Sequence, residues 1–247
     1  MTHDAISLVT VVFEAEVPLL SLQARSVALF CRPDLFREII VIDNSRSGLS
    51  DTAKKRLLRA YGPTSHLIRW LRPSDIATLP PTDGWYAQQV LKLAVSRMIE
   101  GDAYIVLDAK DHFIAAPAVH DFIEPDGRAR VPFHGYETHP LRSHLERVLE
   151  YLSMPLHPHL AHFAATVTPF TFQTDQVREM IGEVGARREP PDFVHEFIDS
   201  GLLEFFLYSA WLIRRRGSAE AAFSARHGQT PKIWRSTSSL ADVRAAI

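Results

Sequence analysis

The sequence has little of several features that would assign it quickly to a functional class. Its 247 residues include one cysteine, Cys31, so no disulfide can form within the chain, and the side chain is expected to pack as a small apolar group. No apolar run approaches the roughly 20 residues that a membrane-spanning helix needs, and the polar residues 1–4 do not resemble a signal peptide. We therefore expect a cytoplasmic protein, with peripheral association at the inner face of a membrane as the alternative.

Charge and motifs exclude further classes. The formal net charge is -2 at pH 7, so no excess of basic residues calls for a nucleic-acid partner. The patterns G-x-G-x-x-G, G-K-[ST] and G-x-S-x-G are all absent from the sequence. The usual signatures of dinucleotide binding, P-loop chemistry and serine hydrolysis are therefore missing.

The first half of the chain alternates apolar segments with helical patterns. Continuous apolar segments rich in β-branched residues predict strands that are buried on both faces. These segments are residues 6–12, 38–42 and 103–107, and residues 66–71 predict a weaker strand. Helices are predicted between them, at residues 18–30, 51–61 and 85–100. Such alternation is typical of a mainly parallel α/β sheet flanked by helices, with the three strong strands as inner neighbours.

The second half is less regular. Amphipathic or apolar patterns predict helices at residues 141–152, 175–183 and 201–216 and a strand at residues 166–172. No repeat, low-complexity segment or clear linker divides the chain. We expect a single domain over residues 1–247, with a nucleotide-binding half at 1–115 and an acceptor-side half at 116–247.

Two of the predicted strands end in an aspartate, where ligands of parallel sheets bind. Asp43 follows the second strand and can accept a hydrogen bond from a base or ribose, although a turn or cap residue is the alternative. Asp108 follows the fourth strand, and Asp111 lies three residues later. Two such carboxylates can converge on Mg²⁺ or Mn²⁺, while Lys110 between them can contact phosphate directly. A solvated turn is the competing interpretation of this segment.

The flank of one predicted helix and an acid in another are further candidates for the site. Helical spacing places Trp85, Gln88 and Lys92 on one flank of the predicted helix, with Gln89 at its edge, which suggests a polar wall or a plain solvated flank. Glu204 is an acid inside an apolar helical segment. Burial would raise its pKa and suit a catalytic base, unless it pairs with an arginine or lies on an exposed stripe.

A histidine near the C-terminal end is the last candidate. His227 is predicted as a further metal or phosphate contact, with an ordinary surface histidine as the alternative. No H-E-x-x-H or C-x-x-C pattern accompanies the other histidines, so zinc catalysis is not expected.

Three segments carry a resemblance to a known family. G-W-Y-A-Q-Q-V-L-K at residues 84–92, Y-I-V-L-D-A-K at 104–110 and E-F-F-L-Y at 204–208 resemble a little-characterised group of bacterial proteins similar to GT-A glycosyltransferases. The resemblance implies a GT-A-like, Rossmann-like domain that moves a sugar from a nucleotide-sugar donor to a glycan, as in the synthesis of cell-surface polysaccharide. It also implies a nucleotide pocket around Asp43 and the helix that carries Gln88 and Lys92, with a divalent cation, Mn²⁺ or Mg²⁺, at the acidic cluster.

The sequence departs from the family pattern at two positions. Many relatives have D-x-D where this chain has Asp108, Ala109 and Lys110, and many inverting relatives have an E-D pair where Glu204 is followed by Phe205. A lysine can take part of a cation's role. The departures favour one alternative, a degenerate GT-A domain that binds without catalysis. A second alternative is a nucleotidyltransferase, which can share the same sheet architecture. The acidic, glycine-free loop at residues 13–16 counts against the latter.

Overall fold

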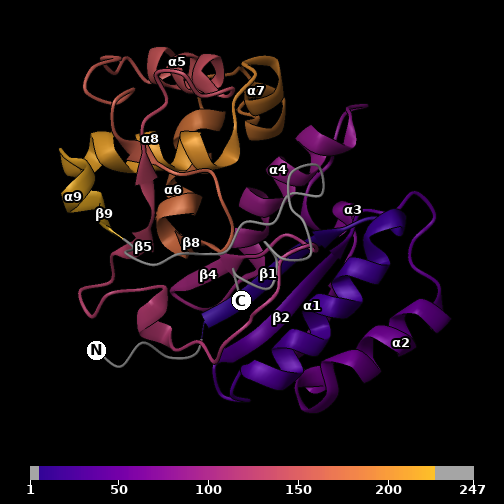
Figure 1. The fold of residues 1–247 in the computed structure, drawn as a ribbon. Coiled ribbons are helices and arrows are strands. Elements are labelled where there is room, and N and C mark those ends of the chain that lie inside the picture. Colours follow the sequence, from indigo (N-terminus) through magenta and orange to yellow (C-terminus); the bar gives the residue numbers. More distant parts are fainter. Residues whose placement is uncertain (1–5, 226–247) are drawn as a thin grey trace.

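The computed structural model describes residues 6–225, and a five-stranded sheet lies at its centre (Figure 1). The strand order is β3-β2-β1-β4-β8. The strands are β1 (Ile6–Val12), β2 (Phe36–Asp43), β3 (Ile68–Leu71), β4 (Ala103–Val106) and β8 (Phe170–Gln173). The first four run parallel, and β8 pairs antiparallel with β4. The mainly parallel α/β sheet is confirmed, with β2, β1 and β4 as inner neighbours.

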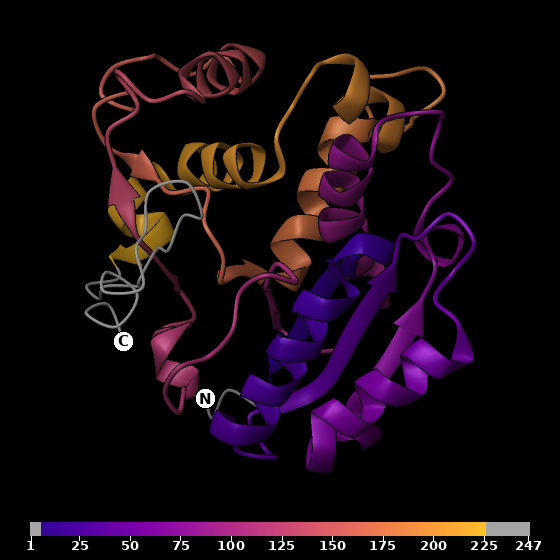
Figure 2. The same ribbon diagram turned by 45° about the vertical axis from the view of Figure 1, so that its right-hand side comes forward.

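Both faces of this sheet are buried, which explains the apolar character of its strands. Successive side chains of a strand point to opposite faces, so Leu8 and Ile39 belong to one core and Val9 and Ile40 to the other. Helices α1 (Val17–Phe30) and α2 (Asp51–Tyr61) cover the first face. Helices α4 (Gly84–Ala94), α6 (Thr174–Gly185) and α8 (Glu204–Arg216) contribute to the second core (Figures 1 and 2).

Local signals set where the helices begin and end. The Ser50 side chain accepts a hydrogen bond from the Ala53 amide at the start of α2, and Asp83 does the same for Tyr86 at the start of α4. Such caps contribute about 1 kcal/mol each. The helix predicted to reach residue 100 stops at Ala94 and continues only as the 3₁₀ turn η3 (Val95–Met98). Arg178 of α6 donates to the backbone oxygens of Ser96 and Ile99, so a side chain satisfies carbonyls at this end.

The second half adds short elements around α8. These are α5 (Arg142–Tyr151), α7 (Phe193–Asp199), α9 (Ala219–Ala222), and the two-stranded sheets of β5 (Ala129–Val131) with β9 (Phe223–Ala225) and of β6 (Phe133–His134) with β7 (Phe163–Ala164). The remaining elements are the short helix α3 (Pro73–Ile76) and the 3₁₀ turns η1 (Glu14–Glu16), η2 (Gly62–Leu67) and η4 (Val119–Asp121).

Two predicted elements of this half begin later than expected. The strand predicted from residue 166 begins at Phe170, directly after Pro169, which has no amide hydrogen to donate to a strand ladder. The helix predicted from Gly201 begins at Glu204, because Gly201 has a φ of +61° and Leu203 is extended. This shift puts Glu204 in the first turn of α8.

The two halves of the chain share the central sheet. Strand β8 of the second half pairs with β4 of the first, and the larger core cluster draws residues from both. Among the helices of residues 6–225, none combines the length and apolar composition that crossing a membrane requires.

Candidate active site

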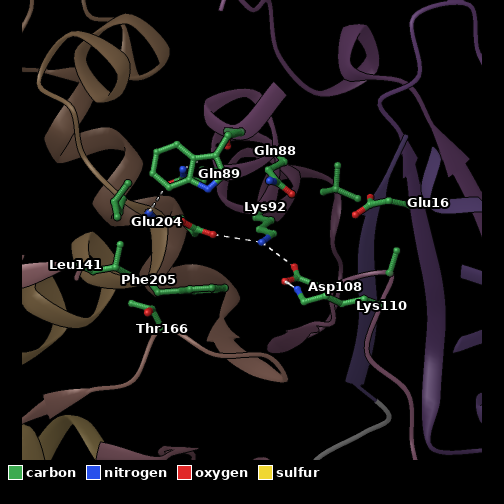
Figure 3. Close-up of a pocket in the computed structure, with 14 residues that line it drawn as sticks. Glu16, Gln88, Gln89, Lys92, Asp108, Lys110, Leu141, Thr166, Glu204 and Phe205 are labelled. Carbon is green, nitrogen blue, oxygen red and sulfur yellow. Dashed lines mark hydrogen bonds and ion pairs between the residues drawn. The ribbon is translucent and has the colours of Figure 1, made fainter. Parts of the chain in front are cut away.

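A pocket of about 300 Å³ lies beyond the carboxyl ends of β1 and β4. This volume is at the lower end of the range for small-molecule sites. Helix α4, the first turn of α8, the turn η1 and the loop that follows β4 all contribute side chains to it (Figure 3). The pocket therefore occupies the place where ligands of open α/β sheets bind.

Lys92 lies at the centre of this pocket with only 6% of its side chain exposed. Its Nζ atom donates to Asp108 Oδ1 at 3.0 Å and to Glu204 Oε1 at 3.2 Å, and it sits 5.1 Å from the centre of the Phe205 ring. Burial alone would lower the pKa of Lys92, but the charges of Glu204 and Asp108 raise it above its ordinary value. The ammonium group therefore stays charged and joins α4, the β4 loop and α8.

Asp108 receives a lysine on each carboxylate oxygen. Lys92 occupies Oδ1, and Lys110 Nζ donates to Oδ2 at 2.7 Å. Burial opposes ionisation, but these two charges hold the pKa of Asp108 below its ordinary value. The backbone of this loop is fixed from α1, where Gln23 Nε2 donates to the carbonyl oxygens of Asp108 and Asp111 at 2.7 and 3.1 Å.

Glu204 opens α8 and turns its carboxylate toward Lys92 (Figure 3). Its backbone amide donates to Gln89 Oε1 at 3.3 Å, and Gln89 Nε2 donates to the Trp85 carbonyl oxygen. Burial raises the pKa of Glu204, and the charge of Lys92 offsets that only in part. The sequence left open that Glu204 pairs with an arginine. In the structure its ion-pair partner is Lys92.

The rest of the α4 flank forms the wall of the pocket. Trp85 is 44% exposed, with Tyr86 and His144 against its ring at centroid distances of 5.0 and 6.1 Å. Gln88 also lines the pocket. The structure thus brings Trp85, Gln88, Gln89 and Lys92 to one site. The hydrophobic stripe of α4 packs against the sheet, and this places the polar flank of the helix beside the carboxyl ends of the strands.

Sequence reasoning missed several residues of the pocket. Glu16 in η1 faces it from the end of β1, and burial, followed by the charge of Asp108, raises the pKa of this carboxyl. Thr166 and Leu141 close the opposite side. The acidic loop after β1 was the only available signal for Glu16. No local sequence pattern predicts that Thr166 or Leu141 lines the pocket. Both belong to the second half of the chain, and the tertiary fold brings them to the pocket.

Asp43 does not meet the expectation that it lines the same pocket as Lys92. Its carboxylate is buried in the loop after β2, where it accepts hydrogen bonds from the Ser45 and Leu49 amides at 3.1 and 2.7 Å. Arg72 forms an ion pair with it at 3.0 Å. Burial opposes ionisation, but these bonds hold the pKa of Asp43 below its ordinary value. This arrangement matches the turn-forming role that the sequence left open.

The predicted metal ligands do not form a convergent set within the part of the chain that the structure describes. Both oxygens of Asp108 are occupied by lysines, and the Asp111 carboxylate accepts a hydrogen bond from the Thr168 hydroxyl. Burial raises the pKa of Asp111. No group of three or more histidine, cysteine, aspartate or glutamate side chains suited to a metal occurs among residues 6–225. His227 lies outside the described residues.

The chain belongs to the family described as "Family of unknown function (DUF6492)", whose model matches residues 14–239. No curated protein sequence matches it.

Solved structures resemble the chain in fold. The apo structure of the bifunctional glycosyltransferase WbbM has a TM-score of 0.50 at 10% identity, over 89% of this chain and 38% of the WbbM chain. A galactosyltransferase, LgtC, bound to donor and acceptor sugar analogues, gives a TM-score of 0.46 at 11% identity, over 80% and 71% of the two chains. Glucosyl-3-phosphoglycerate synthase of M. tuberculosis gives 0.45 at 15% identity, over 93% and 74%. The GT-A-like fold implied by the sequence resemblance is confirmed.

Proposed function

We propose that this member of the DUF6492 family is a glycosyltransferase that moves a sugar from a nucleotide-sugar donor to an acceptor hydroxyl group. The observation that carries the proposal is the network of Lys92, Asp108 and Glu204 in a pocket at the carboxyl ends of β1 and β4. The likeness of the fold to a bifunctional glycosyltransferase supports the same reaction class. A glycan of the cell surface is the acceptor class that the sequence resemblance implies.

The donor would lie along α4 and the loop after β4. Lys110 supplies positive charge for the diphosphate, and Trp85, which is 44% exposed and lines the pocket, offers its ring for a base or sugar to stack on. Gln88 offers both a donor and an acceptor for hydroxyl groups. Gln89 has a different role in this proposal, because its amide already joins the Trp85 carbonyl to the Glu204 amide.

Glu204 is the proposed general base. Transfer to a hydroxyl group requires a group that removes the acceptor proton, and a buried carboxyl with a raised pKa is suited to that task. The sugar–phosphate bond breaks, the diphosphate leaves with the bonding electrons, and the acceptor oxygen forms the new bond as Glu204 takes its proton. Positively charged lysines beside the pocket would stabilise the leaving diphosphate.

A divalent cation has no step in this proposal. Mg²⁺ and Mn²⁺ need several oxygen ligands that converge on one point, whereas Asp108 holds two lysines and Asp111 is bonded to Thr168. The donor set of residues 6–225 does not fit such an ion.

A binding module without catalysis is the second candidate function. Each carboxylate oxygen of Asp108 is bonded to a lysine, which is the observation that favours a degenerate site. The two candidates differ in one outcome. Only the enzyme releases nucleoside diphosphate from a bound nucleotide-sugar.

The first test is a thermal-shift screen of nucleotide-sugars and nucleoside diphosphates, with binding of the best compound measured in wild type and in Trp85→Ala. Ligands that bind only the folded protein raise its melting temperature, by an amount that grows with concentration. We expect at least one nucleotide-sugar to stabilise the wild type. Loss of the aromatic ring should weaken its binding by about 5- to 150-fold, since stacking on an aromatic ring is worth about 1–3 kcal/mol per base.

A matched control separates stacking from a general loss of exposed apolar surface. Leu29 is 77% exposed on α1 and does not line the pocket, so Leu29→Ala should bind the same compound as wild type does. Equal affinity of wild type and Trp85→Ala would place the donor elsewhere. A screen in which no nucleotide-sugar binds would reject the proposal.

A further inference from the structure

Two positive charges, one from α4 and one from the loop after β4, contact Asp108 where the sequence resemblance implies a metal site. Asp108 Oδ1 lies 3.0 Å from Lys92 Nζ, and Asp108 Oδ2 lies 2.7 Å from Lys110 Nζ. A Mg²⁺ ion would have to approach one of these oxygens to about 2.0–2.1 Å. It would then stand beside two ammonium groups already bound to the same carboxylate, and like charges at that separation repel strongly.

We infer that lysine takes the place of the divalent cation in this site. Lys110 binds the donor's diphosphate directly, Asp108 positions the ammonium group of Lys110, and Lys92 positions the Asp108 carboxylate. The inference rests on the proposed function, since it names what neutralises the leaving diphosphate of that reaction. It predicts that donor binding and sugar transfer proceed in the presence of a metal chelator.

The two lysines have different places in the arrangement. Lys92 is nearly buried, donates to Asp108 and Glu204, and has the Phe205 ring beside it. An ammonium group has three N–H donors, so the contacts of Lys92 are largely spent within the protein. Lys92 is therefore a positioning residue that holds the Asp108 carboxylate in place.

Lys110 is the one with room for a ligand. Its side chain is 57% exposed, lines the pocket and has Asp108 as its hydrogen-bond partner among the described residues. Two of its three N–H donors remain for phosphate oxygens. The bond to Asp108 fixes where the ammonium group stands, because Gln23 anchors the backbone of the same loop.

The test measures binding of four nucleoside diphosphates, UDP, GDP, ADP and CDP, by calorimetry in EDTA and again in Mn²⁺. We expect at least one to bind in EDTA with an affinity similar to that in Mn²⁺. Lys110→Met should weaken that binding by about 10- to 100-fold, as expected for loss of a hydrogen bond between charged groups. Lys110→Arg keeps the charge and should retain most of the affinity.

Lys55→Met is the matched control, because Lys55 is an exposed lysine of α2 outside the pocket and its removal changes the net charge equally. It should bind as wild type does, and melting temperatures should show all three variants folded. Binding that requires Mn²⁺, or that is the same in Lys110→Met and wild type, would overturn the lysine inference while leaving glycosyl transfer in place. Absence of binding under both conditions would overturn both.

Discussion

β2 and β4 end in the same way in the sequence and differently in the structure. Each is an inner strand of the sheet that pairs parallel with β1, with Asp43 as the last residue of β2 and Asp108 two residues beyond the end of β4. Asp43 after β2 is turned into its own loop and satisfied by the Ser45 and Leu49 amides and Arg72. Among residues 6–225, the Asp108 carboxylate after β4 is bound by two lysine side chains, one of which faces the pocket.

The difference lies in what the partners can do when a ligand arrives. Asp43 accepts hydrogen bonds from amides of its own loop, so we expect that carboxylate to stabilise the loop. Lys110 can share its ammonium group between Asp108 and an incoming anion, so the second strand end can serve binding. The partners of the two aspartates therefore distinguish the strand end that we propose as the site from the one that we expect to be structural.

The largest effect is expected at Glu204, the proposed general base, which lies beside Lys92 at the Asp108 end of the sheet. Glu204→Gln keeps the shape and hydrogen-bonding capacity of the side chain but cannot take a proton. The rate of sugar transfer per folded molecule should fall by about 10²–10⁴-fold, with donor affinity close to wild type, while loss of the ion pair with Lys92 lowers the melting temperature. Steady-state rates and calorimetry on the same preparation check this.

The pH profile adds a second readout for Glu204. A base must be ionised to act, so activity is lost as pH falls through its pKa, and burial raises that pKa. The acid limb of the wild-type profile should therefore lie above the range of an exposed glutamate. A limb in the ordinary glutamate range, or a destabilised variant that transfers at the normal rate once folded, would remove Glu204 from the mechanism.

The next effect compares the cations at the two strand ends through the free energy of unfolding. Lys92→Met leaves Asp108 with one partner and Glu204 with no ion pair in a buried setting, and breaking a buried pair in this way costs about 3–5 kcal/mol. Arg72→Met removes a cation that is 36% exposed and leaves both amide bonds to Asp43, so about 1 kcal/mol is expected.

Urea unfolding of both variants at neutral pH measures the two free energies. If Lys92→Met does not fold, Lys92→Arg, which retains a charge, should recover much of the loss. A loss for Arg72→Met as large as that for Lys92→Met would show that the two ends are equally dependent on their cations.

Much of the fold was predictable because burial on both faces leaves a plain mark on a strand. Residues 6–12 and 103–107 are almost wholly apolar, and their positions in the centre of the sheet follow from that. Element ends were less predictable, since tertiary contacts decide them. Arg178 of α6, which donates to the Ser96 carbonyl oxygen in η3, lies 82 residues further along the chain.

The candidate site was predictable only in part. The spacing on α4 was enough to group Trp85, Gln88 and Lys92, because helical geometry is local. The ion pair of Lys92 with Glu204 joins residues 112 apart, and no local pattern announces it. Asp43 and Asp108 have equivalent sequence contexts, so only their partners in the folded chain distinguish them.

Release of nucleoside diphosphate from the nucleotide-sugar that binds best tests the proposed site most directly, measured in wild type, Asp43→Asn and Asp108→Asn at equal folded concentration. Wild type should turn the compound over. Asp43→Asn should be less stable, by about 1–3 kcal/mol for a buried amide left without its acceptor, yet release diphosphate at the wild-type rate per folded molecule. Asp108→Asn should lose most of that rate. Failure of the wild type to consume any nucleotide-sugar, or equal loss of rate in both variants, would contradict the assignment of the site to the end of β4.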